Sequence, residues 1–126
     1  MFCITFKGTG EMLSIIIVNY KSSTDLDVCL SSIIEHEKTY KSFEFIVVDN
    51  NSHDSGLTGL LKKYPFLKIV NSTKNGGFAY GNNIGIKHAK GDVFFLLNPD
   101  TILKDAAITK LLYRLESDNR LDIIGP

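Results

Sequence analysis

Four short stretches of the chain consist almost entirely of apolar residues, without the strict alternation of apolar and polar positions that a half-exposed strand shows. Each is rich in Ile, Val, Leu or Phe, and such runs are typical of parallel strands covered on both faces. The pattern therefore predicts four buried strands of a mostly parallel sheet. They span Leu13–Asn19, Phe43–Asp49, Leu67–Val70 and Val93–Asn98.

Between and after these strands, apolar residues recur at helical spacing. Cys29 lies on the apolar face of the first predicted helix, so we interpret it as a core residue. The second helix ends before Pro65, and the third runs from about Gly77 to His88. The candidate caps are Thr24 or Asp25 for the first helix and Asp54 or Ser55 for the second. The fourth, after Lys104–Asp105, has an apolar face of Ile108, Leu111, Leu112 and Leu115.

Strands and helices thus alternate along the chain, which predicts an α/β fold with right-handed crossovers. The last residues, Leu121–Pro126, begin a further apolar strand. We therefore expect the sequence to be a truncated piece of a larger domain. Met12 directly precedes the first strong strand, so residues 12–126 are the expected domain. Residues 1–11 are expected to be an upstream extension or a frayed tail.

The composition fits one globular domain and gives no sign of a nucleic-acid partner. The chain has 126 residues, with 14 Lys plus Arg balancing 14 Asp plus Glu, so it has no basic field that would attract nucleic acid. Two cysteines make neither a disulfide framework nor a zinc site, which favours a cytoplasmic protein. The three histidines, His36, His53 and His88, show no metal-ligand spacing.

Polar residues follow all four predicted strands. Ligands of open α/β sheets bind at the carboxyl ends of the strands, so this convergence is the main sequence evidence for a site. The strand ends read Val18-Asn19-Tyr20, Asp49-Asn50-Asn51-Ser52, Asn71-Ser72-Thr73-Lys74-Asn75-Gly76-Gly77 and Asn98-Pro99-Asp100-Thr101.

Each of these signals also has a purely structural interpretation. Asn51 and Asp54 suit turns and caps. The segment Asn75–Gly81 can cradle phosphate through its N–H groups or form a tight turn. Pro99 ends the last strand and fixes the direction in which Asp100 leaves the sheet. That carboxylate suits Mg²⁺ or Mn²⁺, or it caps the following helix, and local sequence does not separate the two.

Four ordered motifs resemble those of the family 2 glycosyltransferases with the GT-A fold. They are LSIIIVNYKSSTDLDVCLSSI, FEFIVVDNNSHDSG, NSTKNGGFAYGNNIGIKHAKGD and VFFLLNPDTIL. They look most like the rhamnosyltransferase-like branch that builds cell-surface polysaccharides, and they cover residues 12–126. The resemblance implies a mostly parallel, Rossmann-like sheet flanked by helices.

The resemblance also implies a nucleotide-diphospho-sugar donor and a divalent cation, Mg²⁺ or Mn²⁺. In place of the usual Asp-x-Asp the chain has Asn98-Pro99-Asp100, so Asp100 would bind the metal and Asn98 the diphosphate or ribose. Asn50 would read a uracil or thymine imide, and Asp49 would contact the nucleotide or brace its loop. The implied nucleotide-sugar-binding residues are Val18, Tyr20, Asp49, Asn50, Lys74, Asn75, Asn83, Asn98 and Asp100.

For the whole enzyme, the resemblance implies inverting sugar transfer to a glycan or lipid-linked acceptor, from a UDP- or dTDP-sugar donor such as dTDP-rhamnose. The catalytic base and the acceptor site are expected beyond Pro126. We also expect a protein of the cytoplasm or of the inner face of the membrane, and self-association of the fragment through its exposed apolar face and free sheet edge. The main alternative is a non-catalytic nucleotide-binding module. A receiver domain fits poorly because the first strand ends Asn19-Tyr20, and a nucleotidyltransferase lacks its glycine-rich basic loop.

Overall fold

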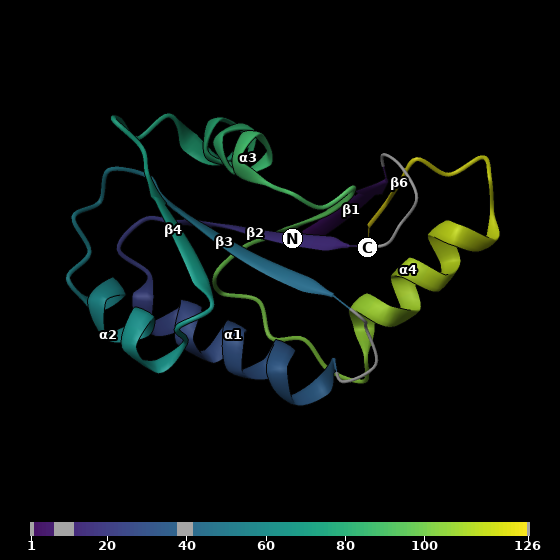
Figure 1. Ribbon diagram of the computed structural model, residues 1–126, viewed down its shortest axis with the longest axis horizontal. Coiled ribbons are helices and arrows are strands. Elements are labelled where there is room, and N and C mark those ends of the chain that lie inside the picture. The colour runs from purple at the N-terminus through teal and green to yellow at the C-terminus, as the bar shows by residue number, and fades with distance from the viewer. Residues whose placement is uncertain (1, 7–11, 38–41, 126) are drawn as a thin grey trace.

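The computed structural model describes residues 2–6, 12–37 and 42–125, which form one sheet with helices on both faces (Figure 1). The strands are β1 Phe2–Phe6, β2 Leu13–Asn19, β3 Phe43–Asp49, β4 Leu67–Asn71, β5 Val93–Leu97 and β6 Ile123–Ile124. The helices are α1 Ser23–His36, α2 Gly56–Lys63, α3 Gly77–His88 and α4 Ala107–Ser117.

The strand order is β4-β3-β2-β5-β1-β6, and β4, β3, β2 and β5 run parallel. The four predicted strands and the α/β fold are therefore confirmed. All seven residues of β2 are buried, because both of its faces are covered and both of its edges are paired. In the described residues, no helix is long and apolar enough to cross a membrane.

The antiparallel side of the sheet includes a strand that the sequence pattern did not indicate. Phe2–Phe6 form β1, an extra strand paired with β5 from Phe2 opposite Leu97 to Phe6 opposite Val93. Residues 1–11 are the expected extension or frayed tail, and residues 1 and 7–11 of this segment lie outside the described part. The further strand expected near the end is β6, which pairs antiparallel with β1.

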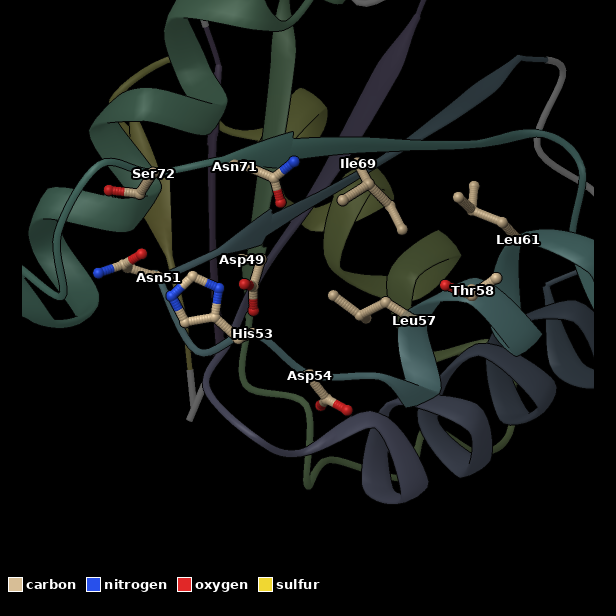
Figure 2. Close-up of a pocket in the computed structure, with 10 residues that line it drawn as sticks. All are labelled: Asp49, Asn51, His53, Asp54, Leu57, Thr58, Leu61, Ile69, Asn71 and Ser72. Atoms are coloured by element: carbon tan, nitrogen blue, oxygen red, sulfur yellow. The ribbon is translucent and has the colours of Figure 1, made fainter.

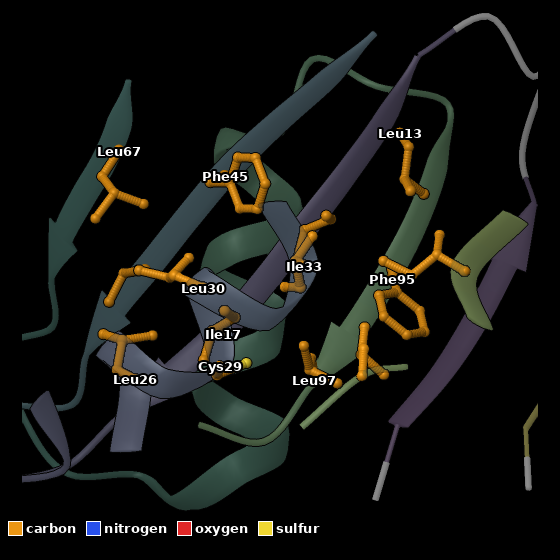
Figure 3. Packing of buried hydrophobic residues seen from close by; sticks show 14 of the residues in the cluster. Leu13, Ile17, Leu26, Cys29, Leu30, Ile33, Phe45, Leu67, Phe95 and Leu97 are labelled. Carbon is orange, nitrogen blue, oxygen red and sulfur yellow. The ribbon is translucent and has the colours of Figure 1, made fainter. Parts of the chain in front are cut away.

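The core has two layers on opposite faces of the sheet. Helices α1 and α2 lie on one face with α4 beside them, and α3 lies on the other (Figure 1). Apolar side chains of α1, Cys29 among them, pack against residues of β2, β3 and β5 (Figure 3). Cys29 is fully buried, which confirms its predicted place in the core.

The predicted helices form, and one residue, Asp54, caps the starts of both α1 and α2. Neither Thr24 nor Asp25 caps α1. Instead the carboxylate of Asp54 accepts the N–H of Ser23 at 3.0 Å. The same carboxylate accepts the N–H of Gly56 at 3.0 Å, so the prediction of Asp54 at the start of α2 is confirmed. The carboxylate of Asp54 thus fixes the starts of both α1 and α2 beside the carboxyl ends of the strands.

Candidate functional site

The carboxyl ends of the parallel strands meet at one edge of the sheet. Asn19, Asp49 and Asn71 are direct partners across β2, β3 and β4, and Ile17 of β2 lies opposite Leu97 at the end of β5. From β2 the chain winds outward through β3 to β4, and α3 then carries it back to β5. The order therefore reverses between β2 and β5, which is where open α/β sheets bind ligands.

The turn after β5 carries Asn98 and Asp100. The N–H of Thr101 donates to the carbonyl oxygen of Asn98 at 3.2 Å, which closes a turn with Pro99 at its second position. Asp100 is exposed. The alternative of Asp100 as a helix cap is wrong, because the next helix, α4, begins several residues later and its first N–H groups donate to Glu37.

The negative charge of Asp100 affects the ionisation of Cys29 on α1. Burial raises the pKa of the Cys29 thiol to about 12, and the negative charge of Asp100 adds to the shift. The thiol therefore stays protonated and is not a nucleophile at neutral pH. Among the described residues, no three His, Cys, Asp or Glu side chains gather to hold a metal. A cation at Asp100 would need oxygen atoms from a phosphorylated ligand and from water.

Asn50 lies at the end of β3 and is 2% exposed. Its Nδ2 group donates to Asn75 Oδ1 and to the carbonyl oxygen of Gly77, both at 3.0 Å. Its Oδ1 is buried and has no hydrogen-bond partner in the structure. A buried acceptor without a donor costs free energy, so this oxygen is the group in the loop that most needs a partner.

Asp49 braces the loop rather than pointing into open solvent. Its carboxylate accepts the N–H and the hydroxyl of Ser52, and it accepts Nδ2 of Asn19 at 3.0 Å. Asn19 in turn accepts the N–H of Ser22 at 3.2 Å and donates to Asp54. Of the two roles that the resemblance implies for Asp49, these contacts favour the bracing one. Asn19 is a further polar residue of this edge, and its place at the end of an apolar strand was the available signal in the sequence.

The cationic and aromatic candidates lie at the surface of this edge. Tyr20 is 47% exposed, and the ammonium group of Lys21 lies 5.8 Å from the centre of its ring. Lys74 lies 5.1 Å from the centre of the Tyr80 ring. A half-exposed tyrosine face can stack on a base, and an exposed ammonium group can pair with a phosphate.

Two predicted contacts on the α3 side are not brought to the open edge. Val18 is buried beneath α3, where a Cβ on Gly81 would lie 2.6 Å from its Cγ1. Asn83 is exposed and, at 100° per residue, points away from the sheet that Gly81 and Gly85 face. The nucleotide-sugar contact that the resemblance implies for Asn83 stays a prediction. Its neighbour Asn82 is the buried one, and its Oδ1 has no partner.

A pocket of about 470 Å³ opens beside this edge, between α2 and the ends of β3 and β4. Leu57 and Ile69 point into it from α2 and β4 (Figure 2). Two carboxylates and no Lys or Arg occur among its described lining residues, so it is poorly suited to a diphosphate. The lining residues are Asp49, Asn51, His53, Asp54, Leu57, Thr58, Leu61, Ile69, Asn71 and Ser72.

Residues 14–126 match a family model described as Glycosyl transferase family 2. An uncharacterized glycosyltransferase of Haemophilus influenzae is 31% identical over 117 residues, which are 90% of this chain and 36% of the relative. Poly(ribitol-phosphate) beta-N-acetylglucosaminyltransferase TarP of Staphylococcus aureus is 30% identical over 117 residues, again 90% of this chain and 36% of the relative. The chain therefore spans only about a third of the length of these proteins.

Two solved structures give the same TM-score of 0.72. One is S. aureus TarS 1-349 in complex with UDP-GlcNAc, at 24% identity, covering 84% of this chain and 31% of that chain. The other is the mannosyltransferase PcManGT from Pyrobaculum calidifontis in complex with GDP-Man and Mn²⁺, at 22% identity, covering 85% and 32%. At these identities the likeness shows the fold alone.

Proposed function

Because the chain belongs to glycosyltransferase family 2, we propose that its strand-end edge binds the nucleotide diphosphate of a sugar donor. The GT-A-type fold provides the edge, with the order of the strands reversing between β2 and β5. The observation that carries the proposal is Asp100, an exposed carboxylate on a proline-fixed turn beside that reversal. Its position suits the phosphate end of a donor.

A divalent cation fits the donor atoms at this turn. Mg²⁺ and Mn²⁺ prefer oxygen ligands and are often held by one or two carboxylates together with phosphates and water. Asp100 would hold such an ion, and Asn98 on the same turn would contact the diphosphate or ribose. When bound, the cation supplies positive charge for a leaving diphosphate. The complex of PcManGT with Mn²⁺ supports a metal in this fold.

The uracil or thymine base of the nucleotide would lie between β2 and the start of α3. Tyr20 offers a half-exposed ring for stacking, and Asn50 offers an unpaired amide oxygen for an imide N–H. Lys74 and the loop at Asn75 lie on the approach to the phosphates. Uridine nucleotides are supported by the complex of TarS with UDP-GlcNAc. dTDP-rhamnose rests only on the resemblance to the rhamnosyltransferase-like branch.

For the longer protein to which this chain would belong, we propose inverting sugar transfer in cell-surface polysaccharide synthesis. The relatives are glycosyltransferases, and the chain covers about a third of their length. The general base and the acceptor site are expected beyond Pro126, so the chain alone should bind a donor without transferring sugar. A non-catalytic nucleotide-binding module remains the alternative, and sugar transfer by the longer protein would exclude it.

The proposal is tested by calorimetric titration of the chain with UDP and dTDP, with and without Mn²⁺. We expect binding that depends on Mn²⁺ and weakens about tenfold or more in Asp100→Ala, since a charged metal ligand is removed. Asp122→Ala is the matched control, because Asp122 is an exposed carboxylate just before β6. Equal affinities of wild type and Asp100→Ala for both nucleotides would contradict the assignment.

A further inference from the structure

The side-chain amide of Asn50 has both of its N–H groups engaged. Nδ2 donates to Asn75 Oδ1 and to the carbonyl oxygen of Gly77, each at 3.0 Å. An amide nitrogen carries two hydrogens, so these two bonds use its full capacity to donate. The backbone N–H of Asn50 also donates to the carbonyl oxygen of Asn19 at 2.9 Å, which fixes the residue between β2 and β3.

Asn75 is itself held in one orientation. Its Oδ1 accepts the backbone N–H of Gly77 at 3.1 Å as well as Nδ2 of Asn50. Because two donors face this atom, the oxygen rather than the nitrogen of the Asn75 amide must lie there. Gly77 has φ of +84°, a conformation that glycine adopts without strain, and its carbonyl oxygen accepts from Asn50. The start of α3 and Asn75 together therefore fix the amide of Asn50.

The consequence is that Asn50 can only accept a further hydrogen bond. Its Oδ1 is buried without a partner, whereas its nitrogen is fully used. A free asparagine could turn its amide by 180° and offer either group. Here that turn would place Oδ1 of Asn50 against two other oxygen acceptors. The loop thus gives an uncharged asparagine the hydrogen-bonding behaviour of a carboxylate.

We propose that Asn75 is a positioning residue that holds Asn50 as an acceptor, so that the site selects uracil or thymine over cytosine. Uracil and thymine carry a hydrogen on N3, whereas N3 of cytosine carries a lone pair that would face the amide oxygen. Solvent does not reach this oxygen in the structure, so base binding must displace the groups that cover it. The inference rests on the proposed function, and it gives the side chain of Asn75 an orienting role in the binding of the nucleotide.

The first test compares the dissociation constants of UDP and CDP for wild type, Asn75→Ala and Asn75→Asp. We expect wild type to prefer UDP by about tenfold or more, since a mismatched buried polar group is costly. Asn75→Asp retains an acceptor for Asn50 and for Gly77, so it should keep the preference. In Asn75→Ala the amide of Asn50 keeps only the carbonyl oxygen of Gly77 as an acceptor, so it turns more easily and the preference for UDP should fall. Equal weakening of both nucleotides in Asn75→Ala would overturn the proposal.

The second test does not require a nucleotide. Both side-chain N–H protons of Asn50 should exchange slowly with solvent in wild type and in Asn75→Asp, and faster in Asn75→Ala, as measured by NMR. The exposed side chain of Asn83 is the internal reference. Exchange of Asn50 as fast as that of Asn83 in wild type would overturn the orienting role even if UDP binds. Slow exchange with no binding of either nucleotide would instead overturn the proposed function and, with it, the selection of the base.

Discussion

At the residue scale, glycine determines how closely α3 approaches the sheet. A Cβ on Gly81 would lie 2.6 Å from Cγ1 of Val18, and one on Gly85 would collide with Ile16. The backbone of α3 therefore rests directly on β2, and its first turn is brought to the strand ends where Asn50 meets Asn75. Gly59 of α2 has no such neighbour, because a Cβ there would meet nothing within 4 Å.

We expect Gly81→Ala to lower the free energy of unfolding by about 1–3 kcal/mol, since the added methyl group overpacks the contact with Val18. The matched control is Gly59→Ala, which should raise stability by about 0.5–1 kcal/mol, because alanine is the better helix residue where space is open. Urea unfolding of the three proteins measures both effects. Stabilisation by both substitutions would show that the contact between α3 and β2 is looser than the structure indicates.

At the scale of elements, the start of α4 depends on a residue far away in the chain. The carboxylate of Glu37 accepts the N–H of Ile108 at 2.7 Å and the N–H of Thr109 at 3.2 Å. Ala106, directly before the helix, has φ of +53° and makes no side-chain cap. Glu37 at the end of α1 therefore joins two helices of the same core layer and satisfies N–H groups that α4 cannot bond internally.

Removing this cap in Glu37→Ala should lower the free energy of unfolding by about 1–3 kcal/mol, because buried N–H groups of α4 lose their acceptor. Glu35→Ala is the matched control, since Glu35 lies on the same helix and is exposed. Denaturant unfolding would be followed for both variants. A loss of similar size in Glu35→Ala would attribute the effect to α1 rather than to the cap.

At the scale of the whole molecule, a partly buried carboxylate joins neighbouring segments at each end of the sheet. Burial alone would raise the pKa of Asp54, but hydrogen bonds from Ser23, Asn19 and Gly56 outweigh it and hold the pKa below its ordinary value of 3.8. At the opposite end of the sheet, hydrogen bonds from Ser14 and from backbone N–H groups likewise outweigh burial and hold the pKa of Glu44 below 4.5. The folded protein therefore stabilises the ionised form of both carboxyl groups.

Since both pKa values are lower in the folded protein than in the unfolded chain, the stability they contribute is present above about pH 4.5. It is lost as the pH falls through the lower folded-state values. We expect the free energy of unfolding to decrease below about pH 4. Asp54→Asn should be less stable at pH 7 and should show a shallower decrease in acid, and Asp122→Asn should follow wild type. Parallel pH profiles for wild type and Asp54→Asn would contradict the role of Asp54.

The sequence by itself determined the parallel strands, the helices and the edge of the sheet where polar residues gather. Four strands and the bounds of α3 followed from apolar runs and helical spacing, because those patterns reflect neighbours a few residues apart. The motifs after the strands also predicted the family. Asn19, Asp49 and Asn71 then lie together because parallel strands of similar length end at one edge.

The tertiary structure alone decided which polar groups find a partner in a distant segment and which do not. No local pattern shows that Glu37 caps α4, that Phe2–Phe6 pair with β5, or that Asn83 points away from the sheet while Asn82 is buried. The orientation of Asn50 likewise depends on Asn75, which lies in another loop. These features arise from contacts between segments distant in the chain, and such contacts exist only once the sheet and its two helical layers have packed.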